Sequence, residues 1–171
     1  FTGGIAVTAL GHSHPRVVGT MREQAGTLLH VSNLFYIPQQ VHLAKLLCDH
    51  SFADRVFFSN SGAEANETAL KLARKWAKEP GASARGVIIS MRGGFHGRTL
   101  APVTATAQEK YHHGFEPLVP GLKHVPYNDL RAMERAIDNR TAGVIVECIQ
   151  GEGGVHLADD DYLRGLRKLC D

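Results

Sequence analysis

The sequence predicts an α/β fold in which a mainly parallel sheet is covered by helices on both faces. Short apolar runs rich in Val and Ile occur at residues 86–90 and 143–147, and a weaker run lies at 124–125. Segments with helical spacing of apolar residues separate and flank these runs. Strands that are buried on both faces form continuous apolar runs, and their alternation with helices is typical of parallel sheets.

Two helices are expected in the first fifty residues. Apolar residues recur at helical spacing between residues 15 and 29, and Pro15 suits the first turn. A second apolar stripe begins at Val41 and predicts a helix that ends near His50. The aromatic segment between the two helices, residues 30–38, is expected to be irregular, and residues 55–58 are expected to form a short buried strand.

The clearest helical pattern follows Ser61. Glu64 and Glu67 occupy its first turns and basic residues its last turns, which matches the helix macrodipole. Pro80-Gly81 is expected to end this helix. Further helices are expected at residues 130–137 and over the last ten residues, where an amphipathic pattern stops without a C-cap. We therefore expect either that further chain follows the sequence given or that a partner covers the apolar faces of the sheet.

The composition is that of an ordinary globular domain. The chain has 171 residues, of which 43% are hydrophobic and 21% charged, and its formal net charge is +2. Its charges form no basic stripe, which argues against nucleic-acid and membrane-surface partners. Three cysteines without metal-ligand spacing favour reduced thiols, and no apolar run approaches the ~20 residues of a membrane helix. A cytoplasmic protein with a small-molecule substrate is expected.

The segment at residues 57–67 is typical of an anion site. An apolar run ends in small polar residues at Ser59 and opens directly into the strong helix. The free N–H groups of a first helical turn can hold a phosphate, and Gly62 allows a ligand to approach closely. The sequence contains neither the P-loop motif nor the dinucleotide motif, which argues against ATP and NAD. A phosphorylated cofactor is therefore expected, although these serines can also serve only as a helix cap.

Three further segments accompany this one, at residues 3–15, 94–99 and 144–154. In this order the four motifs resemble the class III aminotransferases of the ornithine/acetylornithine type, which use pyridoxal phosphate. The resemblance covers the whole chain and is closest to the acetylornithine/succinylornithine branch. It implies fold type I of the pyridoxal-phosphate-dependent transferases. Residues 1–45 would then lead into the large domain, and residues 46–171 would form its first, incomplete part.

The resemblance also implies a cofactor site and a substrate site. Ser61, Gly62 and Ala63 correspond to the phosphate cradle, and Phe95 to the aromatic residue that stacks on the cofactor ring. Arg98 resembles the arginine that binds the substrate carboxylate, for which a planar bidentate fork is suited. The resemblance also identifies two residues near the mouth of the active site, in a loop that can cross a dimer interface or pack locally: Asn33 and Tyr36.

Two glutamates are the catalytic candidates. Glu147, expected at the end of a buried strand, resembles the motif glutamate near the cofactor. Glu152 matches the glutamate that pairs with a distant arginine and moves aside for a dicarboxylate. That arginine would lie beyond Asp171. Cys148 stands where proline is usual, and we expect it to be a buried small hydrophobe and not a reactive thiol.

By resemblance, a homodimer would transfer an amino group from N-acetylornithine, or a related ω-amino donor, to 2-oxoglutarate in arginine biosynthesis or degradation. The motifs that carry the Schiff-base lysine and the carboxylate for the pyridine nitrogen are not in this sequence, so the 171 residues alone are expected to be inactive. Two alternatives stay open, an aminomutase of the glutamate-1-semialdehyde type and a fragment that only binds phosphate or pyridoxal phosphate. No metal is expected, because His12 and His14 lack a companion ligand.

Overall fold

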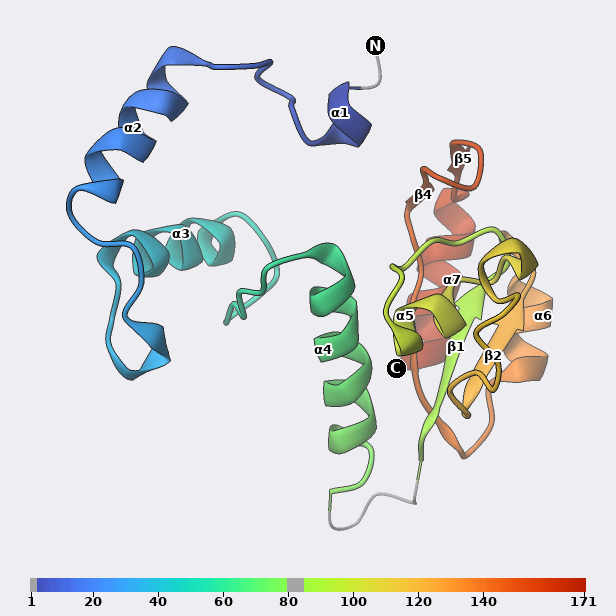
Figure 1. Ribbon diagram of the computed structural model, residues 1–171. Coiled ribbons are helices and arrows are strands. Elements are labelled where there is room, and N and C mark those ends of the chain that lie inside the picture. Colours follow the sequence, from blue (N-terminus) through green and yellow to red (C-terminus); the bar gives the residue numbers. More distant parts are fainter. Residues whose placement is uncertain (1–2, 80–84) are drawn as a thin grey trace. The chain divides into compact units, whose positions relative to one another are not determined.

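The computed structural model describes residues 3–79 and 85–171 and divides into two compact units, Phe1–Phe57 and Phe58–Asp171 (Figure 1). The first unit is helical. Its elements are α1 (Gly3–Ala6), α2 (Pro15–Ala25), the 3-10 helix η1 (Ser32–Leu34) and α3 (Pro38–Asp49). The two helices predicted for this region are confirmed. The domain boundary expected after residue 45 stays a prediction.

The first unit leaves its apolar residues exposed. Neither α2 nor α3 contains a buried residue, although both begin with the proline that suits a first helical turn. The two helices are joined by a hydrogen bond in which Gln39 Nε2 donates to Gln24 Oε1 at 2.9 Å. Exposed apolar side chains in this unit include Met21, Val41, Leu43, Leu46 and Leu47. The unit's apolar faces are therefore available for packing against further protein.

The buried strand predicted at residues 55–58 is wrong. These residues are irregular, and the Phe57 side chain is 67% exposed. A strand needs a neighbour for its backbone N–H and C=O groups, and no strand pairs with this segment in the described ranges 3–79 and 85–171.

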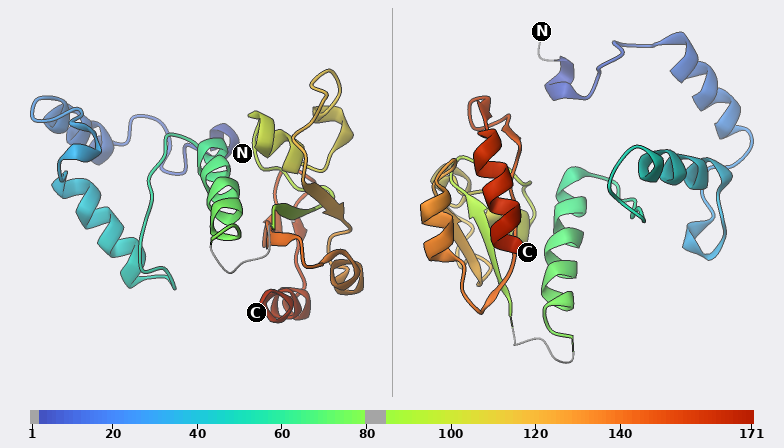
Figure 2. Two further views of the ribbon diagram at one scale, coloured as in Figure 1. Left: turned by 90° about the horizontal axis from the view of Figure 1, so that it is seen from below. Right: turned by 180° about the vertical axis from the view of Figure 1, so that it is seen from behind.

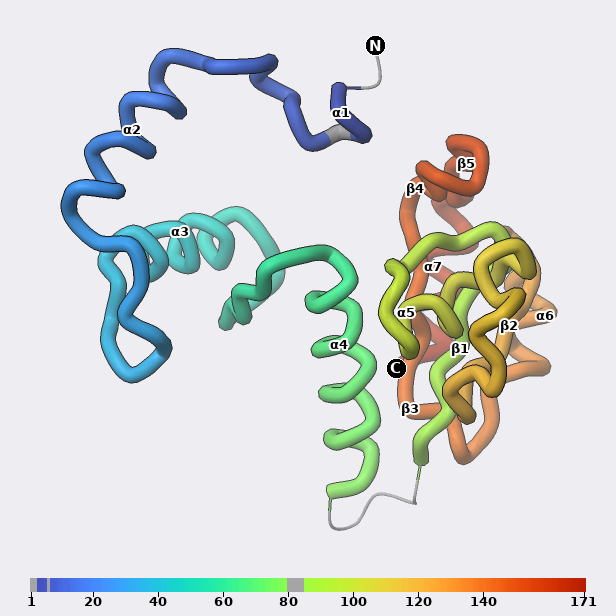
Figure 3. The backbone as a smooth tube through the Cα atoms, in the orientation of Figure 1, coloured from blue at the N-terminus to red at the C-terminus, as the bar shows by residue number. Residues whose placement is uncertain are grey.

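The second unit contains the predicted parallel sheet. Its strands β1 (Val87–Met91), β2 (Leu122–Val125) and β3 (Thr141–Val144) lie in the order β2-β1-β3, and both pairings are parallel (Figure 3). The register places Ile89 opposite Lys123 on one side and Val144 on the other. The sheet predicted from the apolar runs is confirmed, but β3 begins and ends earlier than the run at 143–147 indicated.

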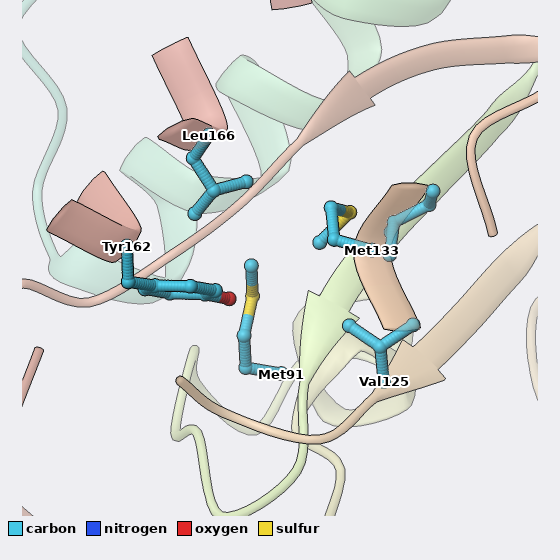
Figure 4. Close-up of a cluster of buried hydrophobic side chains, with 6 residues drawn as sticks. Met91, Val125, Met133, Tyr162 and Leu166 are labelled. Atoms are coloured by element: carbon cyan, nitrogen blue, oxygen red, sulfur yellow. The ribbon is translucent and has the colours of Figure 1, made fainter. Parts of the chain in front are cut away.

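Helices cover both faces of this sheet, as predicted. Successive residues of β1 point to opposite faces. Ile88 packs with Leu70 of α4 (Gly62–Trp76) and Ala105 of α5 (Leu100–Ala105). Ile89 packs on the other side with residues of α6 (Leu130–Ala136) and α7 (Asp160–Cys170). These are the orange and the red helix in Figure 2. Figure 4 shows five members of this second cluster, Met91, Val125, Met133, Tyr162 and Leu166.

The remaining elements lie beside the sheet. They are the 3-10 helix η2 (Glu109–Tyr111) and an antiparallel hairpin formed by β4 (Ile149–Gln150) and β5 (His156–Leu157). Helix α4 ends at Trp76, and the predicted Pro80-Gly81 stop lies outside the described residues. None of the helices in the described ranges is long and apolar enough to span a membrane.

Candidate functional site

The first turn of α4 has an N-cap and an adjacent glycine. Ser61 is the N-cap, and its Oγ accepts a hydrogen bond from the Glu64 N–H at 3.2 Å. The Glu64 carboxylate in turn accepts the Asn60 N–H at 2.7 Å, so the helix start is fixed from both sides. Among the described residues, no atom outside the helix's own backbone and the neighbours of Gly62 lies within 4 Å of the position that a Cβ on Gly62 would occupy. The serine therefore caps the helix, and its O–H and the first-turn N–H groups remain able to donate to an anion.

The loop that follows β1 packs directly on this helix start. Gly97 has φ +124°, and a Cβ on it would lie 2.8 Å from the Cβ of Ala63. Asn66 Nδ2 donates to the carbonyl of His96 at 2.7 Å, one turn further along α4. The loop and the candidate phosphate cradle therefore form one rigid arrangement, since glycine alone allows this approach.

Phe95 and Arg98 lie on this loop. The Phe95 ring is half-buried and meets the Tyr111 ring edge-on, with 5.6 Å between centroids. The Arg98 guanidinium carbon lies 4.8 Å from the centroid of Tyr111 and 5.9 Å from that of Phe95. Arg98 is exposed and forms no ion pair with any residue in the described ranges. A guanidinium held against aromatic rings in this way is available to a carboxylate from solution.

Glu147 is hydrogen-bonded to the same loop. Its Oε1 accepts the Phe95 N–H at 2.6 Å, and the Tyr127 hydroxyl donates to its backbone carbonyl at 2.8 Å. The prediction that Glu147 ends a strand is wrong, because β3 stops at Val144, opposite Ile89 of β1. The half-buried carboxylate thus fixes the backbone of the residue whose ring is the candidate for cofactor stacking.

Cys148 is exposed, so the prediction of a buried hydrophobe at this position is wrong. Its backbone carbonyl accepts the Ala158 N–H at 3.0 Å and the Tyr127 hydroxyl at 3.3 Å. The chain here has left the sheet for the hairpin, and the adjacent Ile149 is also 54% exposed. The apolar residues beside Cys148 in the sequence therefore did not indicate that its side chain is buried.

Glu152 is held by three donors from one short segment. Its carboxylate accepts hydrogen bonds from Gln108 Nε2 at 2.6 Å, Lys110 Nζ at 3.0 Å and the Tyr111 hydroxyl at 2.5 Å. These contacts lower the pKa of Glu152 from 4.5 to about 2, with the Tyr111 hydrogen bond as the largest cause. Sequence analysis missed these partners, which lie 41 to 44 residues from Glu152 and carry no local motif.

The charge of Glu152 is expected to persist into strongly acidic solution. Since its pKa is lower in the folded than in the unfolded chain, its stabilising contribution is complete above the ordinary value of 4.5 and is lost as the pH falls toward 2. A carboxyl ¹³C NMR titration of Glu152 should give a midpoint of about 2. A midpoint near 4.5 would show that the three donors do not hold the carboxylate in solution.

The loop also carries a buried, neutral histidine. His96 is 5% exposed, and its Nε2 has no hydrogen-bond partner in the described ranges. Burial, and to a lesser degree the nearby charge of His124, lowers the pKa of His96 to about 4. His96 is therefore uncharged near neutral pH and adds no positive charge beside Phe95.

The second unit brings together seven of the nine predicted site residues through the contacts above. These are Ser61, Gly62, Ala63, Phe95, Arg98, Glu147 and Glu152. The other two, Asn33 and Tyr36, are exposed residues of the first unit, and their place at the mouth of the site stays a prediction. Among the described residues there is no group of three side chains suited to a metal ion.

The family model of the class-III aminotransferases matches residues 1–171. Acetylornithine aminotransferase from Caldanaerobacter subterraneus subsp. tengcongensis is 50% identical over the whole chain, which covers 44% of that protein. The acetylornithine aminotransferase of Methanocaldococcus jannaschii is 52% identical, with 100% of this chain and 43% of that protein covered. This chain thus spans less than half the length of these curated relatives.

Two solved structures are also similar. Ornithine aminotransferase from Toxoplasma gondii ME49 has a TM-score of 0.89 and 35% identity, over 99% of this chain and 41% of that one. A PLP-bound amine transaminase from an uncultivated Pseudomonas species has a TM-score of 0.91 and 28% identity, over 99% of this chain and 44% of that one.

Proposed function

The chain belongs to the class-III aminotransferase family, and on this basis we propose that the full-length protein transfers an amino group from N-acetylornithine to 2-oxoglutarate, with pyridoxal phosphate as cofactor. Two relatives with 50% and 52% identity over the whole chain carry the name acetylornithine aminotransferase. The observation that carries the proposal is structural: the open first turn of α4 is packed against the loop of Phe95 and Arg98.

The residues present fit the phosphate end of this cofactor. Gly62 leaves the space beside the first turn empty, where a side chain would begin to fill it. The N–H groups of Gly62 and Ala63 have no partner within the helix, and the positive end of the helix dipole favours an anion there. When bound, pyridoxal phosphate supplies an electron sink for the amino-group transfer. We propose that its lysine and its pyridine-nitrogen carboxylate come from outside this chain.

Each remaining site residue has a proposed task. Phe95 offers a ring to the flat cofactor, with its backbone fixed by the N–H bond to Glu147 and its ring in edge-on contact with Tyr111. Arg98 binds a substrate carboxylate, since its guanidinium is exposed and already fixed against Tyr111. Glu152 adjusts the site to substrates of different charge. This division separates anion binding at α4 from substrate binding at the loop.

The full-length protein is also proposed to be a cytoplasmic homodimer, with the large domain beginning near residue 46. Support for an interface comes from the first unit, whose exposed apolar residues need further protein to cover them. We also propose that Asn33 and Tyr36, whose side chains are both exposed, belong to the substrate site of the full-length protein.

The test is an assay of the full-length protein with N-acetylornithine and 2-oxoglutarate. Glutamate is expected to accumulate only when pyridoxal phosphate and both substrates are present. Absence of glutamate would overturn the proposal, and rearrangement of glutamate 1-semialdehyde without transfer to added 2-oxoglutarate would favour the aminomutase instead. The 171-residue chain alone should show no turnover.

Replacing Ser61 by alanine tests the phosphate cradle. The variant should bind pyridoxal phosphate about tenfold more weakly, because a hydroxyl donor to a charged group is lost. It should also lose about 1 kcal/mol of unfolding free energy through the missing cap. The measurements are an absorbance titration of the cofactor-free full-length protein and urea unfolding.

Asp129→Ala is the matched control. Asp129 caps α6 by accepting the Ala132 N–H at 2.8 Å, so its loss removes a comparable cap away from the site. We expect a similar drop in stability and an unchanged affinity for pyridoxal phosphate. Equal cofactor affinities of the two variants would contradict a phosphate-binding role for Ser61.

A further inference from the structure

Two groups of opposite charge in the candidate site contact the same aromatic ring. The Arg98 guanidinium carbon lies 4.8 Å from the centroid of Tyr111, and the hydroxyl of that tyrosine donates to Glu152 Oε1 at 2.5 Å. A guanidinium and a carboxylate that come into direct contact can form a strong bidentate pair. In the described ranges no ion pair joins Arg98 to Glu152.

The reason lies in what already surrounds Glu152. Its two oxygens accept from Tyr111, Gln108 and Lys110. Gln108 Nε2 also donates to the Gly94 carbonyl at 3.1 Å, which ties the cluster to the loop of Phe95. The carboxylate is therefore retained at the segment 108–111.

We propose that Tyr111 is a positioning residue that retains the Glu152 carboxylate and so leaves Arg98 free for a carboxylate of the substrate. This inference rests on the proposed function and names a specificity element of the same site. The hydroxyl of Tyr111 donates a hydrogen bond to Glu152, and its ring contacts Arg98 and Phe95.

Tyr111 carries more of this role than its neighbours do. Lys110 is also bonded to Glu152, but its side chain is 60% exposed, so water and salt weaken its attraction. Gln108 donates hydrogen bonds to Glu152 and to the loop. None of its hydrogen bonds within the described ranges goes to Arg98. Among the residues that the structure describes, Tyr111 is the one with contacts to both charged groups.

The test replaces Tyr111 by phenylalanine in the full-length protein loaded with pyridoxal phosphate. Glutarate serves as a simple dicarboxylate probe, and its dissociation constant is measured by calorimetry. In Tyr111→Phe the ring contacts persist, whereas Glu152 is released toward Arg98 and competes with the probe. Glutarate should bind about fivefold more weakly, while the affinity for pyridoxal phosphate and the urea midpoint stay unchanged.

Two further variants distinguish positioning from a merely structural effect. Adding Glu152→Gln to Tyr111→Phe removes the competing charge and should restore glutarate binding to within about twofold of the wild-type value. Lys110→Met, which removes the exposed donor alone, should change glutarate binding by less than about twofold. Unchanged glutarate affinity in Tyr111→Phe, or no restoration in the double variant, overturns the inference.

The outcome also separates the inference from the proposed function. Wild-type protein that binds glutarate but forms no glutamate from N-acetylornithine and 2-oxoglutarate overturns the proposed function alone. Wild-type protein that does not bind glutarate overturns the inference, because Arg98 would then have no carboxylate to receive.

Discussion

Replacing Gly97 by valine is expected to lower the free energy of unfolding by about 3 kcal/mol and to abolish tight binding of pyridoxal phosphate. Gly97 has φ +124°, a region that side-chain-bearing residues rarely adopt. A Cβ there would lie 2.8 Å from the Cβ and 3.0 Å from the Cα of Ala63. Either the loop of Phe95 or the first turn of α4 must then move, and the two halves of the cofactor site separate.

Gly86→Val is the matched control for Gly97→Val. Gly86 lies directly before β1 in the same unit, and no atom of the described residues, apart from its chain neighbours, lies within 4 Å of a Cβ built on it. In urea unfolding and in an absorbance titration with pyridoxal phosphate, this control should show a stability and a cofactor affinity close to those of the wild-type protein. Equal binding of the cofactor by both valine variants would contradict a role for the close packing of Gly97 against Ala63.

The parallel sheet could be predicted because its cause is local. A strand buried on both faces needs apolar residues in succession, and Ile88 and Ile89 supply two opposite clusters from adjacent positions. The same pattern was misleading at residues 55–58. Their apolar run is similar, but pairing depends on a neighbouring strand, which a single segment does not reveal.

One part of the candidate site could likewise be predicted from the sequence, and another part could not. The helix start at Ser61 and Gly62 is encoded in consecutive residues, so motif and geometry agree. The environment of Glu152 is formed by a segment more than forty residues away, at Gln108 to Tyr111. The sequence places no apolar periodicity or motif on those donors, and only the packing of the hairpin against the loop brings them together.

Replacing Glu147 by leucine is expected to lower kcat of the full-length protein at least about tenfold. The leucine has a similar size but cannot accept the Phe95 N–H, which is now bound at 2.6 Å. An unpaired N–H at this half-buried position costs about 1–3 kcal/mol, so the loop will shift to recover a partner. Phe95 and Arg98 would move with it. Steady-state kinetics with N-acetylornithine and 2-oxoglutarate measure the loss.

Glu147→Gln separates the two roles that this glutamate can have. The amide oxygen still accepts the Phe95 N–H, so a residue whose task is to position the loop should keep kcat within about threefold of the wild-type value. If the negative charge itself acts in the reaction, glutamine should be as damaging as leucine. The hydrogen bond from the Phe95 N–H favours positioning, and the neighbouring His96 is uncharged near neutral pH. Equal losses in the two variants would instead identify Glu147 as a catalytic residue.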